Sequence, residues 1–64
     1  MNIIKFRVQR TFGQQELTWK TDAFSDCIGN EQRLRIEIAT SLQMQGQIVH
    51  SGDITIMGTY NAYN

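Results

Sequence analysis

The sequence contains no proline and only one cysteine, and its formal net charge is zero. A single cysteine excludes an internal disulfide, and the lone histidine, His50, is too far from Cys27 along the chain for a zinc-binding spacing. A balanced charge argues against a dedicated DNA-binding protein, whose affinity depends on many phosphate contacts. No apolar run reaches the roughly 20 residues of a membrane-spanning helix, and the N-terminus does not resemble a signal peptide. The sequence predicts a cytoplasmic protein without metal, cofactor or membrane partner.

The chain has 64 residues, which predicts one small domain over residues 1–64 with a frayed tail from about residue 61. The core of so short a chain rarely contributes more than about 3–5 kcal/mol. Small proteins often add a disulfide, a metal ion or a partner subunit. Since the first two are excluded, we expect self-association into a homo-oligomer or binding to another protein.

Between Leu34 and Tyr60 the apolar side chains fall almost entirely on even-numbered positions. Successive side chains of a strand point to opposite faces of a sheet, so this alternation is typical of a sheet with one buried and one exposed face. The pattern predicts three strands, over residues 32–39, 42–50 and 54–60.

The N-terminal part of the chain alternates in the same way. Two alternating segments, residues 3–10 and 16–20, flank Gly13, which is free to adopt the positive φ of a tight turn. They predict a β-hairpin. The side chains expected to face its core are Ile4, Phe6, Val8, Leu17 and Trp19.

Residues 22–28 have a helical spacing, with Asp22 in the position of an N-cap and Gly29-Asn30 in that of a stop. A short helix here gives a mostly β domain, ββαβββ, built as a small antiparallel sheet or open barrel. The alternative is an α+β fold, ββαββ, in which one long helix continues to about Gln45 and packs on the sheet.

The long helix is supported by Leu34, Ile38 and Leu42, which stay in phase with residues 22–28. It would, however, leave Ile36 and Met44 on the exposed side. The β-branched pair Ile36 and Ile38 also favours a strand. The mostly β interpretation is therefore preferred, although both remain open for residues 31–45.

No catalytic or metal-binding residues are predicted. Nucleophilic catalysis needs an activated side chain beside a base, and the candidate pair is Cys27 with His50. Cys27 lies on the apolar side of its predicted helix, as a buried cysteine would. The glycines are scattered singly, so no phosphate-binding loop is present. We expect a protein that is not an enzyme.

The candidate binding residues are basic. Lys5 and Arg7 lie on the exposed side of the first predicted strand, and Arg33 and Arg35 lie on that of the third. His50 adjoins a predicted turn. They could form a platform for RNA or an acidic partner, with Phe12 or a C-terminal tyrosine as a stacking group. Alternatively, the charges only solvate a sheet face and His50 is structural.

Residues 22–58 resemble the Sm-like (Sm/Hfq) RNA-binding family, which begins with a short helix followed by strongly bent strands. Asp22-Ala-Phe24 resembles the opening of that helix, and Leu34-x-Ile36-x-Ile38 resembles the first strand. Gly46 stands where the second strand of the family bends. The departures are Thr40-Ser41 in place of the usual Asn-Gly turn and the lack of the second family motif after Gly58. The resemblance implies a small barrel that binds RNA as an oligomer.

Two functions follow from these observations. The first is a non-enzymatic, oligomeric small barrel that binds single-stranded RNA or DNA. The alternative is an accessory protein of the phage or plasmid type, which binds a host protein and inhibits or adapts it. The lack of net charge favours the alternative, whereas the local motif favours the first.

Overall fold

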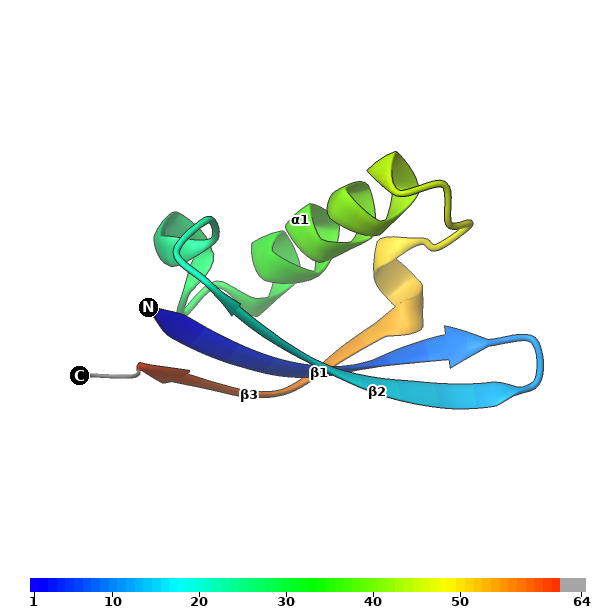
Figure 1. Ribbon diagram of the computed structural model, residues 1–64, viewed down its shortest axis with the longest axis horizontal. Helices are drawn as coiled ribbons and strands as arrows, with labels where there is room; N and C mark the ends of the chain where they lie inside the picture. The colour runs from blue at the N-terminus through cyan, green and yellow to red at the C-terminus, as the bar shows by residue number, and fades with distance from the viewer. Residues whose placement is uncertain (62–64) are drawn as a thin grey trace.

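The structure, a computed structural model, describes residues 1–61. Figure 1 shows two layers, a twisted antiparallel sheet and a helix lying above it. The elements are β1 (Asn2–Arg10), β2 (Gly13–Thr21), the 3-10 turn η1 (Ser25–Cys27), α1 (Glu31–Met44), the 3-10 turn η2 (Ser51–Asp53) and β3 (Ile54–Asn61). The prediction of a mostly β domain with an antiparallel sheet and one helix is confirmed. The frayed tail was predicted from about Asn61, and the residues after it lie outside the described part.

The predicted β-hairpin is confirmed. β1 pairs antiparallel with β2 along its whole length, from Asn2 opposite Thr21 to Arg10 opposite Gly13. Gly13 has a φ of 134°, in the region that favours glycine, and it follows the tight turn Thr11-Phe12. This register places the even-numbered side chains of β1 on the helix side of the sheet.

β3 adds to the free edge of β1, which gives the strand order β2-β1-β3. Ile54 lies opposite Val8, and the pairing runs antiparallel to Asn61 opposite Asn2. A bulge at Lys5/Phe6 gives β3 one extra residue, Met57. The prediction of the third strand over 54–60 is therefore right, but its partner is β1 and not the segment that precedes it.

The strands predicted over residues 32–39 and 42–50 are wrong, because residues 31–44 form α1. Leu34, Ile38 and Leu42 are four residues apart, and this spacing satisfies both an alternating strand and one face of a helix. The strand that the Sm-like resemblance implies at Leu34–Ile38 is likewise helical. Ile36, expected inside the sheet, is 48% exposed on α1.

The predicted short helix at residues 22–28 is reduced to the single turn η1. Asp22 does not cap it but forms an ion pair with the N-terminal ammonium group, at 3.2 Å. Gly29 has a φ of 90°, in the region that favours glycine, and the Asn30 side chain accepts a hydrogen bond from the backbone N–H of Arg33. Asn30 therefore starts a helix where a stop was predicted, and the long-helix alternative is right only from Glu31 onward.

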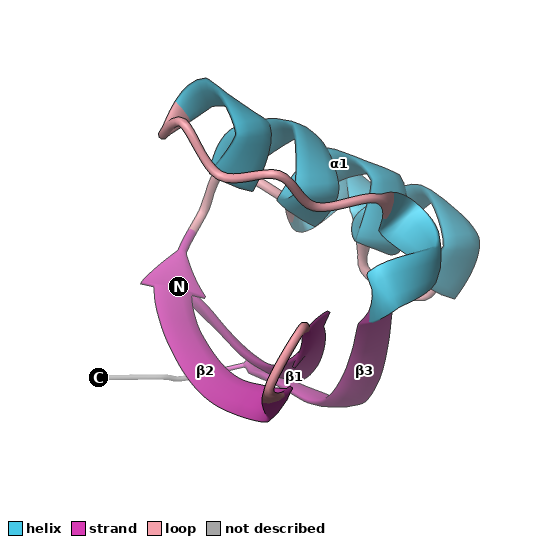
Figure 2. Ribbon diagram, turned by 90° about the vertical axis from the view of Figure 1, so that its right-hand side faces the viewer, coloured by secondary structure: helices cyan, strands magenta, loops and turns pink. Residues whose placement is uncertain are grey.

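The core lies between α1 and one face of the sheet (Figure 2). Phe6 packs edge-on against Trp19, with ring centroids 4.9 Å apart, and Trp19 stacks on Phe24 at 5.9 Å. All of the core is apolar. Its buried members are Ile4, Phe6, Val8, Phe24, Cys27, Leu34, Ile38, Ala39, Leu42, Val49 and Ile54. The other face of the sheet is not covered by any described element.

Candidate binding surfaces

One end of the molecule exposes large apolar side chains. Phe12 is fully exposed, and Ile48 and Met44 are 92% and 84% exposed. Figure 1 shows that the β1–β2 turn, the C-terminal end of α1 and the segment after it lie at this same end. We call Phe12, Met44 and Ile48 the apolar end. Phe12 and Ile48 line one hollow, whereas Met44, on α1, does not line it. Neighbouring exposed apolar side chains are typical of interaction sites.

The local structure holds these side chains outward. Phe12 lies in the turn between β1 and β2, beyond the part of the sheet that α1 covers. The residue after Ile48, Val49, is 1% exposed, and its carbonyl accepts a hydrogen bond from the Gln43 amide at 2.6 Å. Val49 thus anchors the segment to the core, which leaves Ile48 pointing to solvent.

A second hydrogen bond connects the segment after α1, which carries Gln47 and Ile48, to the sheet. The Arg10 guanidinium donates a hydrogen bond to the Gln47 side-chain oxygen at 2.6 Å. Between the hairpin turn and the segment lies a hollow of about 540 Å³. His50, a predicted binding residue, lines it together with Phe12 and Ile48. The structure therefore places His50 beside the apolar end.

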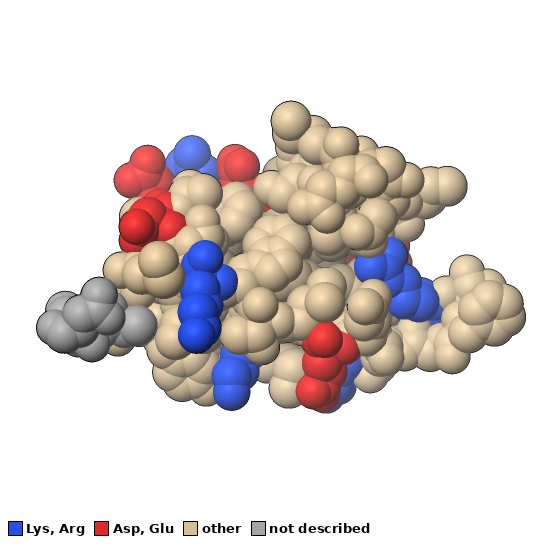
Figure 3. All heavy atoms as spheres, in the orientation of Figure 1, with Lys and Arg blue, Asp and Glu red and all other residues tan. Residues whose placement is uncertain are grey.

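The C-terminal end of α1 and the segment after it carry no formal charge, although Arg10 and Asp53 line the hollow beside Phe12 and Ile48. Residues 38–52 contain no Lys, Arg, Asp or Glu. In Figure 3 the surface over the C-terminal half of α1 has no charged atoms, and acidic atoms gather toward the opposite end of the molecule. Desolvating an uncharged surface costs less than desolvating a charged one. This property favours close contact with another protein.

The uncovered face of the sheet is a second candidate surface. It carries Lys5 and Arg7, both predicted binding residues, and the exposed ring of Tyr60. The Lys5 ammonium lies 5.7 Å from the centroid of this ring. The ring covers Gly58, where an added Cβ would lie 2.9 Å from the Tyr60 hydroxyl. The Arg7 guanidinium is paired with Glu16 at 3.0 Å.

Arg33 and Arg35 do not join Lys5 and Arg7 on this face. They belong to α1, which packs on the opposite side of the sheet, and Arg35 forms an ion pair with Glu31 at 3.3 Å. The sequence pattern grouped the four residues because it assigned Arg33 and Arg35 to a strand. The structure divides them into a pair on the sheet and a pair on the helix.

The remaining candidates for chemistry are separated. Cys27 is 4% exposed in the core, and its turn, η1, lies near the N-terminal end of α1. His50 precedes η2, near the other end of α1 (Figure 1). Among residues 1–61 no group of three or more His, Cys, Asp or Glu side chains could hold a metal ion.

The sequence did not predict Phe12, Met44 and Ile48 as one surface. Phe12 was considered only as a stacking group, and the alternating pattern placed Met44 and Ile48 inside a sheet. The uncharged, glutamine-rich run around residues 43–47 could not have revealed them, because its glutamines also fit the exposed side of the predicted strand.

Comparison of this chain with known proteins finds no relative. No family model matches the chain, and neither a curated protein nor a solved structure is similar to it. The Sm-like resemblance therefore stays a prediction from the sequence. No helix in the described part is long and apolar enough to cross a membrane.

Proposed function

We propose that this protein is a non-enzymatic binding module that attaches to another protein through the apolar end. The observation that carries the proposal is that Phe12, Ile48 and Met44 are the three most exposed large apolar side chains of the described residues, and all three lie toward one end of the molecule. Buried aromatic and aliphatic anchors commonly provide most of the binding energy in protein complexes. A cytoplasmic accessory protein of the phage or plasmid type, which inhibits or adapts a host protein, fits this activity.

The rigid support of the apolar end also favours binding. Val49 and the bond between Arg10 and Gln47 fix the segment that carries Ile48 before a partner arrives. Less conformational entropy is then lost on association. We expect a partner with a mainly apolar pocket for Phe12 or Ile48, surrounded by hydrogen-bonding groups that can satisfy the glutamines.

The test uses tagged protein in the cell that encodes it, followed by quantitative enrichment of bound proteins with and without nuclease treatment. The double variant Phe12→Ser/Ile48→Ser should lose the partner, whereas Ile36→Ser, a control at an exposed position on α1, should retain it. Loss of a hot-spot residue costs at least about 2 kcal/mol. A partner retained equally by all three proteins would contradict binding through the apolar end.

A second candidate, binding of single-stranded RNA or DNA, is favoured by the pairing of Lys5 with Tyr60 on the open sheet face. Aromatic side chains stack with bases, and lysines neutralise phosphates. The ion pair of Arg7 with Glu16 weakens this candidate, because the Arg7 guanidinium is already neutralised by a carboxylate and is less available for a phosphate. The Sm-like resemblance points to the same ligand class, although its motif residues lie elsewhere.

This candidate predicts that oligonucleotide affinity depends on the sheet and not on the helix. Lys5→Gln/Tyr60→Ala should weaken binding to a single-stranded oligonucleotide and flatten the plot of log affinity against log salt by about 0.7 for the lost phosphate contact. Arg33→Gln/Arg35→Gln on α1 should change neither. Absence of binding by the unaltered protein at low salt would exclude this candidate and leave the apolar end unaffected.

A further inference from the structure

The outer edge of β3 has no strand partner in residues 1–61, because β3 is the last strand in the order β2-β1-β3. Natural sheets usually protect such an edge with charged side chains, proline or a covering segment. β3 (Ile54–Asn61) contains no charged residue and no proline. The other edge strand, β2, carries Glu16 and Lys20. β3 therefore lacks the charge and proline that protect an edge, and the bulge at Met57 is the one protecting feature that it carries.

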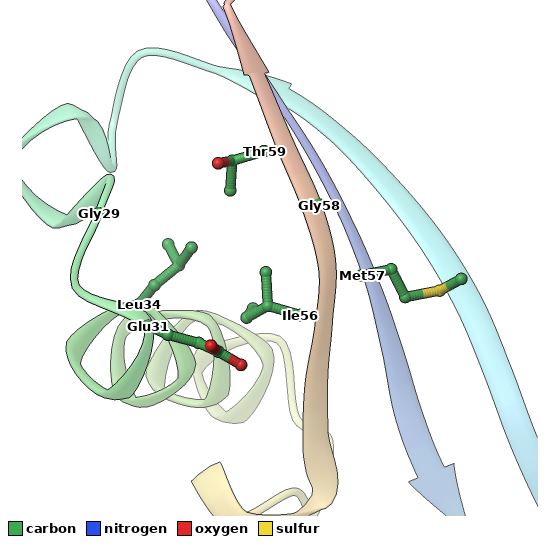
Figure 4. A pocket seen from close by; sticks show the side chains of 7 residues that line it. All are labelled: Gly29, Glu31, Leu34, Ile56, Met57, Gly58 and Thr59. Carbon is green, nitrogen blue, oxygen red and sulfur yellow. The ribbon is translucent and has the colours of Figure 1, made fainter.

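Apolar groups lie on both sides of this edge. Toward α1, a hollow of about 300 Å³ is lined by Leu34, Ile56, Gly29 and Thr59, with the carboxylate of Glu31 at its side. Figure 4 shows the Ile56 and Leu34 side chains pointing into the space between α1 and β3, and the Met57 side chain pointing away from the helix. Met57 is 49% exposed. A strand added to β3 would cover apolar surface on both faces of the sheet.

We infer that a second copy of this chain pairs with β3, so that two β3 strands run antiparallel around a two-fold axis. Strand addition satisfies the edge N–H and C=O groups with a regular partner. The symmetry brings each strand against its own copy, and a strand without charge does so without like-charge repulsion. The chain is short and has no disulfide, so the added burial supplies stability that one copy lacks.

The symmetry also determines the form of the dimer. A two-fold axis that relates neighbouring antiparallel strands is perpendicular to the sheet, so both copies of α1 lie on one side. The two sheet faces that α1 does not cover then form one continuous surface on the other side of the dimer. Because β3 starts at the apolar end and the two strands run in opposite directions, the two apolar ends point away from each other.

One consequence rests on the proposed function, whereas the dimer itself does not. Two apolar ends at opposite ends of one assembly can hold two partner molecules at once. If the partner is itself multimeric, the second attachment is intramolecular and strengthens the complex. Loss of the dimer should then reduce retention of a multimeric partner while leaving the affinity of each apolar end unchanged.

The dimer is tested by sedimentation equilibrium over a wide concentration range. The unaltered protein should approach twice the 7.4 kDa mass of one chain. Thr55→Lys/Met57→Lys adds charges to exposed positions on β3 and should raise the dimer dissociation constant by at least about tenfold. The control, Gln14→Lys/Thr18→Lys, adds the same charge to exposed positions on β2 and should leave the dissociation constant unchanged.

Amide hydrogen exchange of the unaltered protein gives a second measurement that needs no variant. Dimer formation should slow the exchange of β3 edge amides as concentration rises, while the β2 edge does not change. A mass of 7.4 kDa at all concentrations would overturn the inference, as would equal effects of the two double variants or exchange at β3 that is independent of concentration. Failure of the partner enrichment alone would leave the dimer standing, because the two tests use different residues.

Discussion

Replacing Ile38 with lysine should unfold the protein, whereas the same replacement of Ile36 should change the free energy of unfolding by less than about 0.5 kcal/mol. Ile38 is fully buried between α1 and the sheet, and Ile36 is 48% exposed. An unpaired charge in an apolar core costs several kcal/mol, which is comparable to the whole stability of a small domain. The measurement is urea denaturation followed by circular dichroism.

This pair of variants separates the two secondary structures that the sequence allowed. In a strand, positions 36 and 38 face the same side, so both lysines would be buried and both variants would unfold. In α1 the two positions lie about 200° apart around the helix axis. Equal destabilisation by the two variants would contradict α1.

The second large effect is expected from the two phenylalanines of the hairpin. Phe6→Ala should lower the free energy of unfolding by about 3–5 kcal/mol, because truncation of a buried ring leaves a cavity. Phe6 is fully buried and meets Trp19 edge-on at 4.9 Å. Phe12→Ala should leave the free energy of unfolding within about 0.5 kcal/mol of the unaltered value, because Phe12 is fully exposed.

The same denaturation experiment measures both phenylalanine variants, and thermal melting provides an independent check. A large loss of stability in Phe12→Ala would show that its ring packs against the domain. In that case Phe12 would be a structural residue, and its exposure would no longer support a binding site.

The sequence was sufficient for the hairpin because its pattern has one interpretation. Ile4, Phe6 and Val8 alternate with polar residues over a single strand, and all three are fully buried. Gly13 marks the turn, and its positive φ was expected from the lack of a Cβ atom. Local information of this kind does not depend on the rest of the fold.

The helix over residues 31–44 was only the alternative prediction because its buried residues fit two periods at once. Leu34, Ile38 and Leu42 satisfy both a strand and a helix, so the decision depended on neighbouring residues. Ala39, at an odd-numbered position, is 3% exposed, and this burial fits the helix alone. The exposure that a helix would give Ile36 and Met44 was an argument against the helix. In the structure both side chains belong to α1 and are exposed to solvent.

The candidate site could be predicted only in part. His50 was chosen for its position beside a turn, and it does line the hollow at the apolar end. The burial of Val49 and the exposure of Ile48 reverse the predicted alternation, because the segment after α1 is irregular and has no periodic pattern. Whether an apolar side chain is core or surface is decided there by the path of the backbone, which short-range sequence does not specify.

The most direct test of the central claim is a calorimetric titration of the purified partner that the enrichment identifies. Phe12→Ser/Ile48→Ser should bind at least about a hundredfold more weakly than the unaltered protein, which corresponds to about 2.7 kcal/mol, while its unfolding midpoint stays unchanged. Ile36→Ser should bind normally. Equal affinity of the double variant and the unaltered protein would show that the apolar end does not bind the partner.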